Sequence, residues 1–295
     1  MAVAADVKYW VGLSGFAGLG IKRFTLLTKY FGSVKKIYLA PKNSWSKTGI
    51  SADMADAWDK WRNGRDLDKD RQRLETAQIR SITIEDNNYP KLLIETDYPP
   101  FILFIRGSIE TLNQPGLTVI GTRKMTEYGR RATSRFVSQL AKKLTIVSGL
   151  ARGIDGWAHR VCLGNKGKTV AVVGHGLERV YPAEHRGLAE EIVRSGGALV
   201  SEYPLDYPIS KTNFPQRDRL LAGLSLGTLV IEGGQKSGTK ITAGFAADYG
   251  REVFCVPGPI DSPASAGPAQ LIQNGAKLVT KVEDIYEELP AVAIA

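Results

Sequence analysis

Three short segments of this sequence combine small residues with basic side chains in a pattern that suits an anion. They are Gly121-Thr122-Arg123, the run from Ser148 to Asp155, and Gly174-His175-Gly176. Glycine lets a backbone approach a phosphate closely, and an arginine guanidinium adds charge-assisted hydrogen bonds to it. Arg123 and Arg152 would supply those guanidinium groups. Together the segments predict an anion-binding rim built from loops.

A fourth segment, residues 204–219, is polar and has three basic residues around Phe214. The basic residues are Lys211, Arg217 and Arg219. Cations interleaved with an aromatic ring suit single-stranded nucleic acid, because the charges follow the backbone while the ring stacks on a base. The alternative is that Phe214 fills the core and the arginines pair with Asp218 or Glu202. The sequence leaves both interpretations open.

The sequence contains near matches to two nucleotide-binding motifs, and each lacks a required residue. After Gly174-His175-Gly176, Arg179 stands where the dinucleotide motif needs its third glycine. Residues 233–240 nearly spell a P-loop, yet Thr239 and Lys240 are in swapped order, so the lysine cannot take its usual place beside the phosphates. We therefore expect no nicotinamide cofactor and no ATPase activity, and we predict that the protein binds no cofactor.

These segments need a scaffold that brings them to one edge, and the apolar pattern predicts one. Beyond residue 107, short runs rich in Val, Ile and Leu alternate with helical stretches. The runs cover residues 117–120, 145–147, 169–173, 198–200, 226–231 and 252–256. Such alternation indicates a parallel sheet covered on both faces, which binds ligands at the carboxyl ends of its strands. The expected fold is α/β, a Rossmann-like parallel sheet with helices on both faces.

The amino-terminal quarter has a different pattern. Residues 22–31 and 54–61 each place aromatic and aliphatic side chains on one helical face. We expect a small helical domain over residues 1–76, of the SAM or helix-hairpin-helix type. Its turn at residues 18–21 can present backbone amides to a phosphate, while a helical bundle that only caps the next domain explains the same residues.

The other boundaries follow from composition. Residues 77–110 are punctuated by proline and contain an apolar run at 101–106, which predicts an extended linker and a strand leading into the core. The Rossmann-like core should cover residues 111–289, with a tail at 290–295.

Charge narrows the class of partner. The chain of 295 residues has a formal net charge of +9, which favours polyanions. Residues 1–76 contain 14 Lys and Arg against 8 Asp and Glu. Most of the excess charge is therefore amino-terminal, and an anion site in the remainder depends on local clustering and backbone geometry.

Cysteine content and hydropathy exclude other classes. Cys162 and Cys255 have no His or Cys at zinc-ligand spacing, so we expect neither a metal site nor a disulfide framework. No apolar stretch approaches the roughly 20 residues of a membrane span, and the start lacks a signal-peptide pattern. We expect a cytoplasmic protein without a membrane partner.

Seven motifs occur in the order typical of one family. They are Gly121-Thr122-Arg123; Ser148 to Asp155 with Ala158-His159; Tyr181-Pro182; Ser201-Glu202-Tyr203-Pro204; Phe214 to Arg219; Glu232 with Ser237 to Ala243; and Val256-Pro257-Gly258. From about residue 80 to 285 the sequence resembles the DNA-processing protein A (DprA/Smf) family.

The resemblance implies a protein that binds single-stranded DNA, protects incoming DNA during natural transformation and loads RecA recombinase onto it. It implies no catalysis, and we also expect a homodimer. The residues expected to bind DNA are Gly121, Arg123, Ser148, Gly149, Arg152, Gly153, Lys211, Phe214, Arg217, Arg219, Gly238 and Thr239.

Several positions depart from the family's pattern. They are Thr122, where Ser is usual, and His185, Asp218 and Ala269, where Asn is usual. Asp218 matters most, because a carboxylate beside the DNA path repels phosphate unless Arg217 or Arg219 neutralises it.

An enzyme class is the alternative function. The Rossmann-like nucleotide-processing enzymes of the lysine-decarboxylase-like (LOG) group also have a Gly-Ser-Arg turn and a glycine-rich phosphate loop. Their catalytic signature, Pro-Gly-Gly-x-Gly-Thr-x-x-Glu, is missing here, because Gly238-Thr239 is followed by Lys240, Ile241 and Thr242 and no Glu. We therefore expect binding rather than catalysis.

Overall fold

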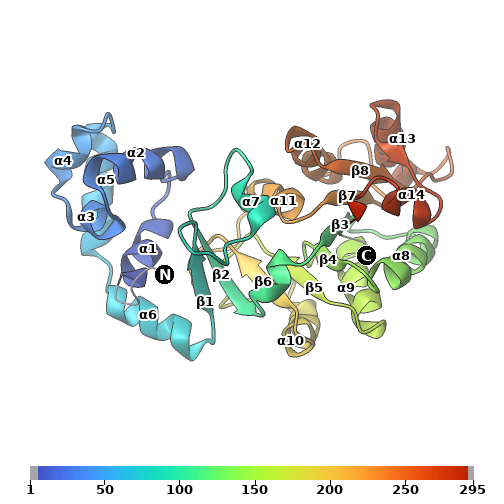
Figure 1. Ribbon diagram of the computed structural model, residues 1–295, viewed down its shortest axis with the longest axis horizontal. Helices are drawn as coiled ribbons and strands as arrows, with labels where there is room; N and C mark the ends of the chain where they lie inside the picture. The colour runs from blue at the N-terminus through green and yellow to red at the C-terminus, as the bar shows by residue number, and fades with distance from the viewer. Residues whose placement is uncertain (1–5, 292–295) are drawn as a thin grey trace.

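The computed structural model describes residues 6–291 and shows an elongated molecule, with amino-terminal helices beside one end of a large sheet (Figure 1). The sheet has nine strands in the order β1-β2-β6-β5-β4-β3-β7-β8-β9. They are β1 (Arg80–Thr83), β2 (Ile102–Gly107), β3 (Gly116–Ile120), β4 (Thr145–Ser148), β5 (Thr169–Val172), β6 (Ala198–Ser201), β7 (Gly227–Val230), β8 (Glu252–Cys255) and β9 (Lys277–Leu278).

Every pairing from β6 to β9 is parallel. Strand β3 lies between β4 and β7, with Thr118 in register with Val147 on one side and Thr228 on the other. The chain adds β4, β5 and β6 in one direction and then returns to place β7 on the other side of β3. The carboxyl ends of β3 and β7 therefore flank the point where strand order reverses, which is where ligands bind in open α/β sheets.

The strands are apolar on both faces because helices cover both. In β3 all five residues are buried, with Leu117 and Val119 entering the core on one face and Ile120 on the other. One face carries α8 (Glu127–Leu140), α9 (Ile154–Gly164), α10 (Arg186–Arg194) and α14 (Glu283–Tyr286); the other carries α7 (Lys91–Ile94), α11 (Asn213–Gly223), α12 (Thr239–Asp248) and α13 (Ala266–Gln273). Short 3-10 turns are η1 (Glu110–Asn113), η2 (Ala183–His185) and η3 (Pro263–Ser265).

The expected α/β class is confirmed, and each apolar run beyond residue 107 forms a strand. One feature differs from a purely parallel sheet, because β1 pairs antiparallel with β2 and β2 pairs antiparallel with β6. Residues 80–107 therefore belong to the sheet. The apolar run expected to form a strand at 101–106 is β2, and residues 80–83 add β1 at the edge of the same sheet.

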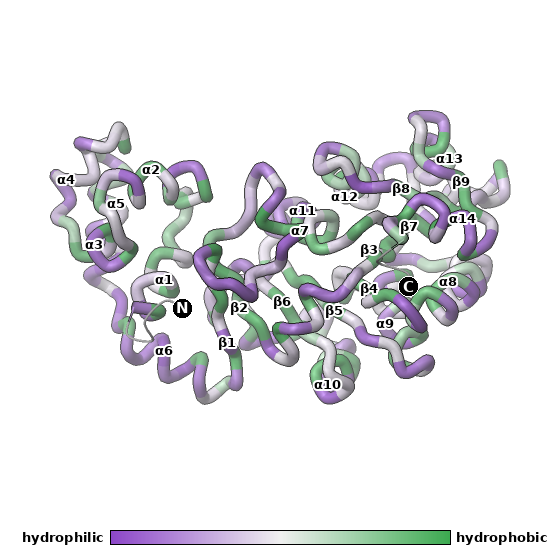
Figure 2. The backbone as a smooth tube through the Cα atoms, viewed as in Figure 1, coloured by the Kyte–Doolittle hydropathy of each residue, from purple (hydrophilic) through white to green (hydrophobic). Residues whose placement is uncertain are grey.

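The amino-terminal helices are α1 (Val7–Ser14), α2 (Ile21–Phe31), α3 (Val34–Leu39), α4 (Lys42–Ser46), α5 (Ala52–Asn63) and α6 (Leu67–Thr76). Side chains of Ser33, Ser51 and Asp66 cap three of them by accepting a backbone N–H three residues on. Their core is aromatic, with the rings of Trp45 and Trp58 stacked at 4.7 Å. Much of α6 is hydrophilic, whereas the strands are mainly apolar (Figure 2).

The helical domain packs directly on the sheet. The ring of Phe24 stacks on that of Phe101 with centroids 4.4 Å apart, and Trp10 lies 6.3 Å from Phe101. Arg73 of α6 forms ion pairs of 3.0 Å with both Glu178 and Asp206 of the core. A shared apolar cluster and the two ion pairs of Arg73 therefore hold the helical domain against the sheet.

Candidate nucleic-acid interface

A cavity of about 210 Å³ lies at the carboxyl ends of β3 and β7. We call it the rim cavity. It is lined by residues that follow three strands and by one face of α11: Ile120, Gly121, Thr122, Arg123, Ala151, Asp155, Arg217, Asp218, Leu221, Ser237, Gly238, Thr239 and Thr242. Of the residues predicted to bind DNA, it brings together Gly121, Arg123, Arg217, Gly238 and Thr239.

The turn after β3 is fixed by a buried carboxylate. Glu232 accepts hydrogen bonds from the backbone N–H and the hydroxyl of Thr126, and its backbone carbonyl accepts from the N–H of Thr122 at 2.9 Å. Gly121 lies so close to Ile154 that a Cβ would overlap that side chain. The turn is therefore held in place while Arg123 stays exposed.

Arg123, which lines the cavity, lies over the ring of Phe214, and the ring of Tyr181 lies beside it. Its guanidinium carbon is 5.4 Å from the centre of the Phe214 ring, within the range of a cation–π contact. The Phe214 ring lies 5.9 Å from that of Tyr181, tilted by 39°. Phe214 is partly exposed, so it is not the core plug of the alternative interpretation. The three side chains thus combine a cation with two rings that a base can stack on.

Behind Arg123, the buried carboxylate of Asp155 accepts hydrogen bonds from backbone amides that we expected to face a bound anion. Asp155 accepts from the Gly149 N–H at 3.2 Å, and the N–H groups of Gly121 and Ala151 also lower its pKa by hydrogen bonding. Burial raises the pKa of Asp155, and the charge of Arg217 opposes that rise. The backbone amides of these turns are occupied by the Asp155 carboxylate. Binding of an external phosphate therefore depends on side chains.

Arg217 is buried beneath the cavity rather than free for DNA. Its Nη1 donates to the Val172 carbonyl at 3.0 Å, and its Nε lies 3.4 Å from Asp218 Oδ1. Gly149 has to be glycine here, because a Cβ would overlap both the Arg217 guanidinium and the Asp155 carboxylate. Gly153 has φ +73° and its Cβ would overlap the Thr122 carbonyl. Glycine at these two positions therefore allows Arg217, Asp155 and the Thr122 carbonyl to approach the backbone closely.

Asp218 faces the cavity as a mostly buried carboxylate. The pKa of Asp218 is raised to about 6, mainly by burial; the charge of Arg217 opposes the rise, Asp155 adds to it and Arg123 opposes it. The negative charges of Asp155 and Asp218 nearly balance the positive charges of Arg123 and Arg217. The rim cavity itself is therefore not strongly cationic. Arg123 is the cation of this set that faces solvent.

The start of α12 forms the opposite wall. The Thr239 N–H points to Ser237 Oγ at 3.3 Å, while the Thr239 hydroxyl is buried and has no hydrogen-bond partner among residues 6–291. That hydroxyl remains a candidate ligand contact. Gly238 is exposed, has an ordinary helical conformation, and no atom lies within 4 Å of a Cβ built on it. No steric constraint in the described chain requires glycine there.

Seven of the twelve predicted residues do not line the cavity. Besides Gly149, Gly153 and Phe214, four others lie outside its lining. Ser148 is fully buried and donates to the Val119 carbonyl at 2.6 Å, so it is structural. Arg152 pairs on the surface with Glu184, whose pKa that hydrogen bond lowers to about 2. Lys211 is exposed and precedes α11 by two residues. The fourth is Arg219 of α11.

Arg219 does not line the rim cavity and forms an ion pair with Glu202. Arg217 lies against Asp218. Both arginines therefore have the acidic partners that the alternative interpretation named. Sequence reasoning assigned no role to Tyr181 or Asp155. Both stand in motifs recognised from the sequence, but only the fold shows that Tyr181 reaches Phe214 and that Asp155 reaches three backbone amides.

Two exclusions hold for residues 6–291. This part of the chain contains no group of three or more His, Cys, Asp or Glu side chains placed to hold a metal ion. It also contains no helix with the length and apolarity needed to cross a bilayer. Cys162 and Cys255 are both buried and free.

The fold and the site define an α/β protein with a loop-built binding cavity at the switch point of its sheet. The chain belongs to the DNA recombination-mediator protein A family, which it matches over residues 80–290. Protein Smf of Escherichia coli is 48% identical over 201 residues, covering 68% of this chain and 54% of that protein. DNA processing protein DprA of Bacillus subtilis is 40% identical over 214 residues, covering 72% of each. The chain thus spans about half the length of the Escherichia coli relative.

Two solved structures extend the comparison. DNA processing protein A from Streptococcus pneumoniae superposes with a TM-score of 0.83 and 32% identity, covering 98% of this chain and 99% of that one. DNA processing protein A from Helicobacter pylori, described with a unique single-stranded DNA binding mode, gives a TM-score of 0.63 and 28% identity, covering 70% of this chain and 94% of that one. The family expected from the sequence motifs is confirmed.

Proposed function

We propose that this protein binds single-stranded DNA at the rim cavity and acts as a recombination mediator. The observation that carries the proposal is the stack of Arg123 on Phe214, beside Tyr181. A cation over a partly exposed ring offers one contact to a phosphate and one to a base, the two contacts that sequence-independent single-strand binding uses. Family membership and the DNA-binding relative from Helicobacter pylori support the same function.

Each element of the site takes a separate role in this proposal. Arg123 binds a phosphate, with Lys211 as a second contact farther along the strand. Phe214 and Tyr181 stack on a base. The Thr239 hydroxyl, left without a partner, and the exposed Gly238 backbone meet the sugar or phosphate at the opposite wall. Gly121, Gly149 and Gly153 hold the walls in position, and Arg217 supports the floor from below.

The finer parts of the function are also proposals. We propose that the bound strand is handed to RecA recombinase, that the protein works as a homodimer in the cytoplasm, and that its role is in natural transformation. We assign no catalysis, because the carboxylates of the site are engaged by Arg217, by backbone amides or by Thr126.

Fluorescence anisotropy with a labelled oligothymidine and with a blunt duplex of equal length, each at two salt concentrations, tests DNA binding. We expect tighter binding of the single strand and a linear fall of log affinity with log salt. Equal or tighter binding of the duplex at the same salt would contradict the proposal. Incubation with nucleoside monophosphates checks the enzyme alternative, for which release of free base is the diagnostic product.

A second assay addresses the recombinase. RecA filament growth on a single strand coated with single-strand-binding protein should accelerate when the wild-type protein is added. The Arg123→Ala protein should give no acceleration, because it cannot hold the strand. Acceleration by both proteins would separate recombinase loading from this site, and acceleration by neither would leave DNA binding without mediator activity.

A further inference from the structure

A second cavity, of about 600 Å³, lies where the helical domain meets the core. We call it the junction cavity. It is enclosed by residues 14–21 after α1, by residues 98–102 at the start of β2, and by α11, α12 and the segment after β6. Its volume is in the range of small-molecule sites, which favour domain junctions. The turn at residues 18–21, singled out in the sequence as a phosphate-binding candidate, forms part of its wall.

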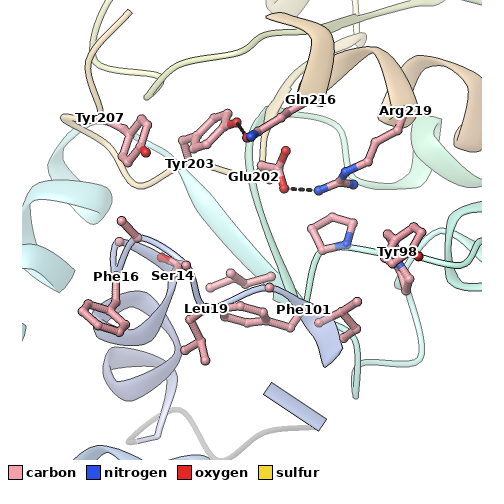
Figure 3. A pocket seen from close by; sticks show the side chains of 18 of the residues that line it. Ser14, Phe16, Leu19, Tyr98, Phe101, Glu202, Tyr203, Tyr207, Gln216 and Arg219 are labelled. Carbon is pink, nitrogen blue, oxygen red and sulfur yellow. Dashed lines mark hydrogen bonds and ion pairs between the residues drawn. The ribbon is translucent and has the colours of Figure 1, made fainter. Parts of the chain in front are cut away.

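Six aromatic rings line the junction cavity, with glycine, proline and aliphatic residues between them. Phe16 and Phe101 lie on one side, Tyr203 and Tyr207 lie on the other, and Tyr98 lies near one end (Figure 3). The rings of Tyr203 and Tyr207 stack with centroids 4.5 Å apart and planes within 19°. Such walls present flat, polarisable faces to whatever enters, and they match a planar ring better than a flexible chain.

One polar edge interrupts these walls. Glu202 and Arg219 form a hydrogen-bonded ion pair across the cavity from Phe101 (Figure 3). Burial raises the pKa of Glu202, and Arg219 opposes the rise. Two further polar atoms of the pair, Glu202 Oε1 and Arg219 Nη1, are buried without a partner among residues 6–291. A buried pair with incomplete hydrogen bonding is weak evidence for a stabilising role, so a role in binding is the better explanation.

The bonded atoms of the pair keep capacity for a ligand. A carboxylate oxygen accepts from more than one donor, and each terminal guanidinium nitrogen carries two N–H groups. Beside them, Gln216 Oε1 accepts from the Tyr203 hydroxyl at 2.9 Å, which leaves the Gln216 amide nitrogen as a further donor. The edge therefore offers an acceptor with donors next to it.

A nucleobase has the matching shape and chemistry. It is planar with apolar faces, and donors and acceptors stand side by side on its edge. A phosphate does not match, because Glu202 neutralises Arg219 and would repel a second anion. A purely apolar ligand does not match either, because it would cover the ion pair without hydrogen bonding to it.

We propose that the junction cavity binds a nucleobase, stacked between its aromatic walls and hydrogen-bonded to the Glu202–Arg219 pair. Helix α11 links this site to the rim, since Phe214 lies at the rim and Gln216 lines the junction cavity. A neighbouring base of the DNA strand is one source of the ligand, which rests on the proposed function. A free nucleoside presents the same chemistry and is the other source.

Nucleosides test the cavity without using phosphate contacts. Adenosine and cytidine are added to the full chain, and saturation transfer from protein to base protons is measured by NMR. Tyr98→Ala removes a ring that is 45% exposed, and Ile241→Trp enlarges a side chain at the cavity wall. Both should reduce the transfer at least about fivefold. Tyr30→Ala, an exposed ring on α2 that lines neither cavity, should leave it unchanged. Thermal melts confirm folding of each variant.

An oligonucleotide arm separates the two sources. If the strand supplies the base, Tyr98→Ala should weaken oligonucleotide binding about tenfold, the loss typical of one stacked base, while Tyr30→Ala should not. Loss of nucleoside signal with unchanged oligonucleotide binding identifies a free nucleoside as ligand and also supports the site. Unchanged binding of both probes by Tyr98→Ala and Ile241→Trp overturns the proposal. If the wild-type protein binds nucleosides but no oligonucleotide, only the proposed function is refuted. Arg123→Ala should keep the nucleoside signal, because Arg123 does not line the junction cavity.

Discussion

The guanidinium of Arg123 lies 5.4 Å from the centre of the Phe214 ring, which joins the turn after β3 to the start of α11. Residues 91 positions apart in the sequence thus form one surface at the end of the sheet. Because Arg123 is exposed and Phe214 only partly buried, the pair contributes little to the core. Changes at either residue should therefore separate DNA binding from folding.

Replacing Arg123 by Ala should weaken single-strand binding by roughly 1 to 3 kcal/mol, the range for a charged hydrogen bond. Arg123→Lys should recover only part of this, because an ammonium lacks the bidentate fork. Binding isotherms at fixed salt measure the effect. Arg194→Ala, an exposed arginine on α10, is the matched control. An Arg123→Ala protein that folds normally and binds like wild type would make Arg123 a structural residue only.

Phe214→Ala should weaken binding by about 1 to 3 kcal/mol through loss of stacking, with little change in the salt slope because no phosphate contact is lost. Phe214→Trp should bind as well as wild type, since a partly exposed site accepts the larger ring. Melting temperatures provide the check on folding. A core residue would instead lose about 3 to 5 kcal/mol of folding stability on truncation to Ala.

Binding should respond to pH through Asp218, whose pKa burial raises to about 6. Ionised Asp218 repels phosphate, so affinity should rise as pH falls through 6 and the carboxyl takes up a proton. Asp218→Asn should bind more tightly at pH 7.5 and show a flatter profile between pH 5 and 7.5. Anisotropy titrations across that range compare the two proteins. Identical profiles would show that Asp218 does not face the strand.

The same carboxyl links pH to folding. The folded state favours its protonated form, so its contribution to stability is complete below its ordinary pKa of 3.8 and is lost as pH rises through about 6. Asp218→Asn should therefore gain stability relative to wild type at pH 7.5 and not at pH 3.5, as chemical denaturation at both pH values can measure.

Two glycines of the site should behave in opposite ways. Gly149→Ala should destabilise the fold and abolish binding, because the added methyl group overlaps the Arg217 guanidinium and displaces Asp155. Gly238→Ala meets no atom within 4 Å and should fold normally. Denaturation curves and binding isotherms on both proteins test this. Loss of binding by folded Gly238→Ala would place the DNA backbone against that residue, whereas an unaffected Gly149→Ala would contradict the packing described.

The sheet was predictable because buried parallel strands are near-continuous apolar runs, as in β3 and β7. The strands β1 and β2 were partly concealed by the prolines between them, which the structure places in the turns around α7. The arginines of α11 were harder to assign. The sequence of residues 204–219 indicates only a polar segment, yet α11 begins at Asn213 and accommodates Pro215 in its first turn, where proline is tolerated. On this helix Arg217 lies beneath the rim cavity and Arg219 points toward Glu202. The sequence periodicity of a helix does not determine which acidic residue each arginine pairs with.

The two outer strands of the sheet bear on how the protein behaves when crowded along DNA. The β1 edge is four residues long and the β9 edge only two, and they begin with Arg80 and Lys277. Long, flat, apolar edges recruit strands from neighbouring molecules, whereas short edges with a positive charge resist such recruitment. Copies that the proposed DNA binding brings side by side should therefore not join their sheets, because neither outer strand offers a long apolar edge.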